Sequence, residues 1–144
     1  MKVADLIASR KEVYSLGEEA TVYDAARYLR DRQVRSCGVC NKDGKLVGVV
    51  SQSDVSDKVA AENKCPAWMR VTEIMTQELV TVPPEAHLDA CLQLMEKFGI
   101  YHLLVVDDKS RFHGMISVTD LLAVIASDEK ARADLLEDLM FPKR

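Results

Sequence analysis

One pattern occurs twice in this 144-residue sequence, and that repetition constrains the fold more than any other feature. A glycine, a serine and an aspartate recur in the same order and at the same spacing, displaced by 66 residues. The matched positions are Gly48 and Gly114, Ser51 and Ser117, Asp54 and Asp120, and Val34 and Ile100. The openings of the two repeats, 3–7 and 71–75, match with a displacement of 68. Self-similarity on this scale indicates one supersecondary unit used twice.

Each repeat has the hydrophobic pattern of a β-α-β-β-α unit that opens with a short helical turn. The expected strands cover residues 12–16, 36–40, 46–50, 79–82, 103–106 and 112–116. The expected helices are the openings 3–8 and 71–76, amphipathic helices through 22–29 and 88–98, and helices that begin near Asp54 and Asp120. Gly99 is expected to end the second amphipathic helix. The predicted fold class is α/β (α+β), with two such repeats and a C-terminal helix.

The expected organisation is a first repeat at 1–62, a linker at 63–70, a second repeat at 71–127 and a helical tail at 128–144. Half of this chain alone would bury only about 60% of its unfolded surface, so the two halves are expected to share a core. Trp68 lies in the linker, where a buried side chain that seals the join is expected. A surface recognition role for Trp68 is the alternative.

The tail has an apolar stripe along one face of its helix, made by Leu135, Leu136, Leu139 and Met140. This stripe either packs back on its own domain or covers a dimer interface or a protein partner. The sequence leaves both interpretations open.

Composition narrows the functional classes. The chain has a formal net charge of −4, with 48% apolar and 29% charged residues, which is typical of a soluble globular protein. Lys and Arg are scattered, so no nucleic-acid partner is expected. Apolar stretches fall short of the ~20 residues of a membrane span, and charge appears too early for a signal peptide. We expect no membrane partner, a cytoplasmic location, and reduced thiols at Cys37, Cys40, Cys65 and Cys91.

The repeated Ser-x-x-Asp motif has two interpretations. A serine and an aspartate at this spacing before an apolar run form a helix-capping pattern. A carboxylate at a strand–helix junction can also accept the two hydroxyls of a ribose, and the nearby backbone N–H groups suit a phosphate. Two such motifs in register favour a nucleotide site, and the serine can cap while the aspartate binds.

The complete repeat, closed by Gly48-Val-Val-Ser51-Gln-Ser-Asp54 and by Gly114-Met-Ile-Ser117-Val-Thr-Asp120, resembles the CBS domain, and two in tandem resemble the CBS pair or Bateman module. The resemblance covers residues 1–126. It implies two repeats packed by pseudo-two-fold symmetry around a cleft that holds an adenosyl ligand, such as AMP, ADP, ATP or S-adenosylmethionine. It also implies a homodimer, a regulated protein partner and no required cofactor.

The same resemblance implies two sets of ligand-binding residues. Ser117 and Asp120 would face Val3, Ala8, Arg35 and Ser36. Ser51 and Asp54 would face Val71, Thr76, Tyr101 and His102. The family's strand proline is absent from both repeats, and Cys37-Gly-Val-Cys-Asn41 also lacks its aspartate, so we expect two unequal sites.

The sequence gives little support for an enzymatic function. Cys37 and Cys40 form a C-x-x-C, but on a strand they would point to opposite faces with Cα atoms roughly 10 Å apart, too far for a disulfide. A zinc site would lack its other ligands. No catalytic motif and no metal site is therefore expected. The leading hypothesis is a non-catalytic regulatory sensor in signal transduction that binds an adenosine-type nucleotide, and the alternative is a ligand-free interaction or dimerisation scaffold.

Overall fold

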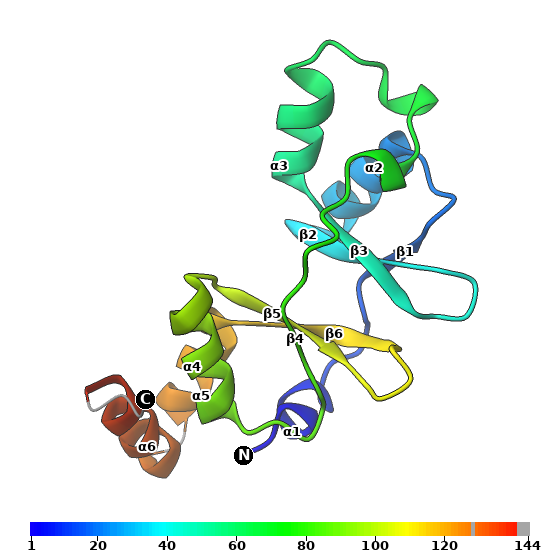
Figure 1. Ribbon diagram of the computed structural model, residues 1–144. Coiled ribbons are helices and arrows are strands. Elements are labelled where there is room, and N and C mark those ends of the chain that lie inside the picture. The colour runs from blue at the N-terminus through cyan, green and yellow to red at the C-terminus, as the bar shows by residue number, and fades with distance from the viewer. Residues whose placement is uncertain (128, 141–144) are drawn as a thin grey trace. The chain divides into compact units, whose positions relative to one another are not determined.

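The computed structural model describes residues 1–127 and 129–140. The chain divides into two compact units (Figure 1). Unit 1 contains Met1–Lys11, Val80–Asp107 and the chain from His113 onward, and unit 2 contains Glu12–Leu79 and Asp108–Phe112. Each unit is therefore built from segments that are distant in the sequence.

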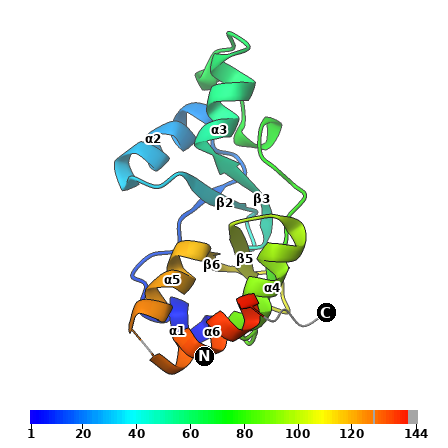
Figure 2. The same ribbon diagram turned by 90° about the vertical axis from the view of Figure 1, so that its left-hand side faces the viewer.

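Unit 2 is a three-stranded sheet in the order β1-β2-β3 with helices on one side (Figures 1 and 2). The strands are β1 (Ser15–Gly17), β2 (Ser36–Cys40) and β3 (Leu46–Ser51); β1 is parallel to β2, and β2 is antiparallel to β3. The helices are α2 (Val22–Arg32) and α3 (Gln52–Val55), which continues as a π-helical segment, Ser56–Ala60. Two 3₁₀ helices follow, Pro66–Trp68 and Val71–Glu73.

Unit 1 repeats this plan with a sheet in the order β4-β5-β6. Its strands are β4 (Thr81–Val82), β5 (His102–Val106) and β6 (Phe112–Ser117). Its helices are α1 (Val3–Ile7), α4 (Leu88–Phe98), α5 (Val118–Ser127) and α6 (Glu129–Met140). The predicted α+β class and the β-α-β-β-α order of elements in each repeat are confirmed.

The amphipathic helices begin at the predicted residues, Val22 and Leu88, and α2 continues beyond the predicted stretch to Arg32. Thr21 caps α2 by accepting a hydrogen bond from the Asp24 N–H (3.0 Å), and Asp24 accepts one from the Thr21 N–H (3.0 Å). Gly99 ends α4 in the left-handed conformation (φ 63°), as predicted, because the glycine lacks the Cβ that disfavours this region. Gln33 takes the corresponding position after α2 (φ 55°).

The two sequence repeats exchange their opening segments. Val3 is fully buried among the apolar residues of unit 1, and its N–H donates to the Ala86 carbonyl (2.8 Å). Val71 is equally buried in unit 2, and its N–H donates to the Ala20 carbonyl (2.8 Å). Residues 1–11, which open the first sequence repeat, thus complete the core that the second repeat builds.

The opening of the second repeat differs from the expected helix over 71–76. It forms a 3₁₀ helix over Val71–Glu73, because Thr76 is drawn into extended pairing with Val49 beside β3. The Thr76 N–H donates to the Val49 carbonyl (2.8 Å), and the Val49 N–H donates to the Thr76 carbonyl (3.0 Å). Strands β1 and β4 also start later than expected, at Ser15 and Thr81.

The prediction that Trp68 is buried is wrong, because its exposed fraction is 86%. It ends the 3₁₀ helix beside α2, and the next residue, Met69, takes the inward position against the core of unit 2. Met69 is further held by its carbonyl, which accepts from the Val22 N–H (2.8 Å). The linker is thus anchored by Met69 rather than by the tryptophan.

The C-terminal helix is present as α6, which lies beside α4 and α5. Leu136, Leu139 and Met140 of the predicted stripe are exposed, at 42%, 51% and 70%. Residue 128 and residues 141–144 of the expected tail lie outside the described residues.

The cysteines differ strongly in burial. Cys37 on β2 and Cys91 on α4 are buried, Cys40 is half-buried and Cys65 is exposed; all four are free thiols. Burial raises the pKa of the Cys37 thiol to about 12 and that of Cys91 to about 11, because the thiolate would lose its hydration. The buried thiols are therefore poor nucleophiles.

The exchange of opening segments predicts unit-specific effects on stability. Val3→Ala leaves a cavity in unit 1 and should cost about 2 kcal/mol. Hydrogen exchange measured by mass spectrometry should show a larger loss of protection in β5 than in β2. Val71→Ala is the matched variant and should give the opposite pattern. Equal losses in both strands for both variants would contradict the exchange.

Thiol alkylation should follow burial. In the folded protein at pH 8, Cys65 should react first with iodoacetamide, and Cys37 and Cys91 should react more than about 100-fold more slowly, since the thiolate is the reacting species. Peptide mass spectrometry over a time course measures each rate, with urea-unfolded protein as the control in which the rates converge. Rapid labelling of Cys37 in the folded state would show that the burial described above is incorrect.

Candidate functional site

The Ser51 motif closes the junction between β3 and α3 in unit 2. The Ser51 N–H donates to Asp54 Oδ2 (2.9 Å), and the Asp54 N–H donates to Ser51 Oγ (3.2 Å). The Ser51 hydroxyl also lies 3.0 Å from the same carboxylate oxygen. These are the reciprocal bonds of a capping box, so the capping interpretation describes this motif. Asp54 is buried, with an exposed fraction of 8%.

The Ser117 motif closes the junction between β6 and α5 in unit 1 with the same bonds. The Ser117 N–H donates to Asp120 Oδ2 (2.7 Å), and the Asp120 N–H donates to Ser117 Oγ (3.2 Å). The Asp120 side chain is 33% exposed, against 10% for that of Asp54. The second carboxylate is therefore the more accessible one.

Each carboxylate also pairs with a cation, and the two cations come from different places. Lys58 Nζ lies 2.9 Å from Asp54 Oδ1, four residues further along the same helical stretch. An Arg10 guanidinium nitrogen lies 2.8 Å from Asp120 Oδ2, which already accepts the capping bonds. Among the described residues nothing bonds to Asp120 Oδ1, which leaves this oxygen available to a ligand hydroxyl.

The glycine three residues before each serine serves a close approach or an unusual backbone. A Cβ on Gly48 would clash with the Met75 side chain, so a larger residue there would force Met75 to move from its place on β3. Gly114 has a φ of +123°, a backbone conformation that residues with a Cβ rarely adopt. A Cβ there would meet an Arg10 guanidinium nitrogen at 3.7 Å. Opening segments therefore cover both junctions.

The valines of the predicted sets lie in the hydrophobic cores. The Val3 and Val71 side chains are fully buried, and their N–H groups are engaged by carbonyls of the same unit. Ala8 and Thr76, near the ends of the opening segments, are exposed. Val3 and Ala8 share unit 1 with Ser117 and Asp120, and Val71 and Thr76 share unit 2 with Ser51 and Asp54.

The remaining predicted residues lie at the starts of β2 and β5. Ser36 is the register partner of Ser51, and the Arg35 carbonyl accepts from the Gln52 N–H (2.9 Å). The Tyr101 carbonyl accepts from the Val118 N–H (3.0 Å), and both Tyr101 and His102 are exposed. Arg35 and Ser36 belong to unit 2, and Tyr101 and His102 belong to unit 1. The expectation that these four residues contribute to the Ser-x-x-Asp site of the other repeat stays a prediction.

Sequence reasoning missed the two cations. The spacing of Lys58 from Asp54 is the ordinary helical i, i+4 spacing of an ion pair, which could have indicated this contact. Arg10 is 110 residues from Asp120, and no local pattern relates them. The contact follows from the exchange of opening segments.

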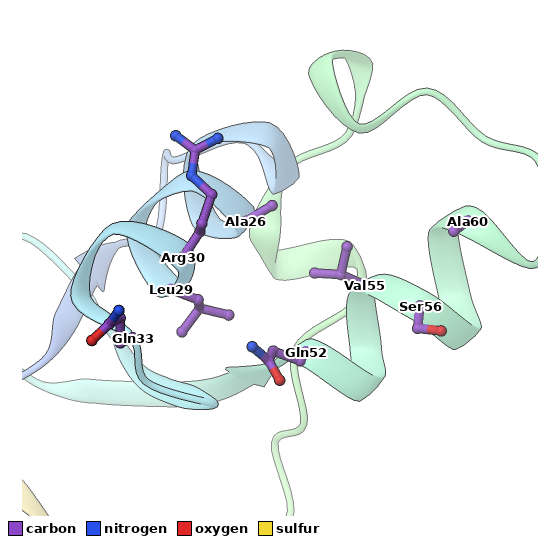
Figure 3. Close-up of a pocket in the computed structure, with 8 residues that line it drawn as sticks. All are labelled: Ala26, Leu29, Arg30, Gln33, Gln52, Val55, Ser56 and Ala60. Carbon is purple, nitrogen blue, oxygen red and sulfur yellow. The ribbon is translucent and has the colours of Figure 1, made fainter.

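A cavity of about 510 Å³ lies elsewhere in unit 2, between α2 and the helical stretch that begins at Gln52 (Figure 3). Leu29, Gln33 and Val55 are among the residues that line it. None of the predicted site residues does. This groove is a feature of the helical face, and it adjoins the Ser51 junction through Gln52, which lines it.

In the part of the chain that the structure describes, no group of three or more His, Cys, Asp and Glu side chains is arranged to hold a metal ion. No helix in residues 1–127 and 129–140 has the length and apolar composition of a membrane span.

Known proteins share this architecture. A CBS domain pair solved with 5′-methylthioadenosine and S-adenosyl-L-methionine is 25% identical, with a TM-score of 0.74 over 88% of this chain and 97% of that one. A CBS domain protein from Pyrobaculum aerophilum, 21% identical, has a TM-score of 0.78 over 94% of this chain and 98% of that one. The second likeness concerns the fold alone.

Curated relatives match most of this chain but are longer. An uncharacterized protein of Methanocaldococcus jannaschii is 28% identical over 88% of this chain and 40% of its own length. A homoserine O-acetyltransferase of Methanococcoides burtonii is 32% identical over 85% of this chain and 24% of its own length. This chain thus spans less than half of either relative.

The family match covers most of the chain and follows the sequence repeat. Residues 3–61 and 71–127 each match the CBS domain. These ranges hold both Ser-x-x-Asp junctions and both opening segments. The chain therefore belongs to the CBS domain family, and it carries that domain twice.

Proposed function

We propose that this protein is a non-catalytic regulatory module that binds an adenosine-type nucleotide in the cleft between its CBS repeats. The observation that carries the proposal is the pair of equivalent strand–helix junctions, each presenting an aspartate that its own serine orients. A CBS pair of the same fold, 25% identical, was solved with two adenosyl ligands, which supports this ligand class.

In the proposed site the serine orients the aspartate, and the aspartate binds the ribose. The serine holds one carboxylate oxygen and fixes the orientation of the aspartate. The other oxygen accepts ribose hydroxyls, and charge-assisted bonds of this kind are stronger than neutral ones. Asp120 is ready for this role, since its Oδ1 carries no bond from the described residues. In unit 2 the ribose would share Asp54 with Lys58.

The remaining contacts in the proposal come from the other repeat, as the family resemblance implies. Arg35 and Ser36 would serve the Asp120 site, and Tyr101 and His102 would serve the Asp54 site. The ligand would favour one arrangement of the repeats by its differential affinity, and a regulated partner or a second copy of the chain would read the change.

A second candidate function is a ligand-free interaction scaffold. One specific observation favours it: both aspartates already have capping partners and a cation without any ligand. In that case the motifs serve stability, and the exposed apolar side chains of Trp68, Leu122 and Tyr101 are available for protein contacts.

Ligand-dependent thermal unfolding separates the two functions. AMP, ATP, adenosine and S-adenosylmethionine are added separately to protein freed of carried-over nucleotide. A ligand at one hundred times its Kd stabilises the folded state by about 2.7 kcal/mol, which raises Tm by roughly 5–11 °C at this chain length. Asp54→Asn and Asp120→Asn should each remove part of the shift, and the double variant should remove all of it.

Asp24→Asn is the matched control for this experiment. Asp24 makes the same capping box with Thr21 at the start of α2, and hydrogen bonds from Thr21 hold the pKa of its carboxyl below the usual range. This variant loses a capping carboxylate but should keep the full ligand shift. If Asp24→Asn abolishes the shift as completely as Asp120→Asn, or if no ligand produces a shift, the nucleotide proposal is wrong and the scaffold is favoured.

A further inference from the structure

We infer that the unit 1 site selects a phosphorylated nucleoside, and that Arg10 is the residue that makes the selection. Arg10 holds Asp120 when the site is empty and turns to the phosphate when ligand binds. The inference rests on the proposed function and adds the charge of the ligand to it.

Arg10 is placed at the junction by three contacts within unit 1. One guanidinium nitrogen pairs with Asp120 Oδ2 at 2.8 Å, and another donates to the Met115 carbonyl. The latter nitrogen also lies over Gly114, 3.7 Å from where a Cβ would be. The guanidinium therefore lies across the end of β6 and the start of α5, where the proposed ligand would bind.

The cost of moving Arg10 depends on the ligand. A ribose bound at Asp120 Oδ1 does not need the oxygen that Arg10 uses, Oδ2, but the ligand must enter the space across the junction that the guanidinium occupies. The Arg10–Asp120 ion pair there has side chains that are about one-third exposed, 31% and 33%. A neutral nucleoside offers the displaced guanidinium no new counterion. A phosphate does, and arginine binds phosphate oxygens in a planar, two-pronged geometry. A cationic ligand such as S-adenosylmethionine adds a like charge near Arg10.

Unit 2 has no arginine in the equivalent place. The side chain of its opening segment that lies over Gly48 is Met75, whereas Arg10 lies over Gly114 in unit 1. Lys58, the cation on Asp54, also donates to the Ile74 carbonyl (2.8 Å) and belongs to the same helical stretch as the aspartate. The opening segment of unit 2 thus places an uncharged side chain over its junction in place of a guanidinium. The two sites differ in charge, and only unit 1 is expected to prefer a phosphate.

The test measures Kd for AMP and for adenosine by calorimetry in the Asp54→Asn protein, in which the unit 2 site is silenced. AMP should bind at least about tenfold tighter than adenosine, as a charge-assisted arginine–phosphate pair implies. Adding Arg10→Met should remove this preference and tighten adenosine binding, because the guanidinium no longer occupies the junction. Arg10→Lys keeps the charge and should restore part of the preference. Arg32→Met, which removes a guanidinium from its ion pair with Glu12 at the end of α2, is the matched control and should leave both Kd values unchanged.

Each outcome has a separate meaning. If Arg10→Met, with a circular dichroism spectrum of the folded protein, keeps the AMP preference of the parent, the inference is overturned while the proposed function stands. If AMP and adenosine bind equally well to the Asp54→Asn protein that still has Arg10, the inference also fails. If neither ligand binds the otherwise unaltered chain, or if binding survives in Asp120→Asn within the silenced background, the proposed site fails and takes the inference with it.

Discussion

The burial of the opening segments in each other's cores is the constraint on which the rest of this structure depends. Val3 and Val71 are fully buried, and each is hydrogen-bonded to a loop of the unit it completes. A three-stranded sheet with two short helices buries a modest apolar area, so a contributed segment matters for its stability. The exchange links the two repeats through the chain itself, since neither core is complete without residues from the opening of the other repeat.

The same exchange gives the two equivalent junctions different chemistry. Each opening segment passes over a strand–helix junction, and one delivers Arg10 while the other delivers Met75 against Gly48. The capping boxes are alike in their bonds and distances, so the local fold preserves the orientation of both aspartates. The two sites therefore differ in the side chains that the opening segments place beside them. This difference allows one fold to bind two different ligands.

The sequence predicted the elements well because their signals are local. Strand β2 has the predicted bounds, Gly99 ends α4, and both Ser-x-x-Asp motifs cap helices. Long-range contacts were missed, since periodicity and caps say nothing about residues 110 positions apart. The exposure of Trp68 was missed for a related reason: its neighbour Met69 fills the inward position, and composition alone favours the tryptophan.

Backbone NMR maps a bound ligand residue by residue, and it can therefore show whether AMP binds at the two Ser-x-x-Asp junctions. Amide shifts of the ¹⁵N-labelled protein would be followed during titration with AMP. The largest shifts are expected at Ser51–Asp54 and Ser117–Asp120, with smaller changes along the groove between α2 and α3. Shifts confined to that groove, at Ala26, Gln33 and Val55, or no shifts at all, would contradict it.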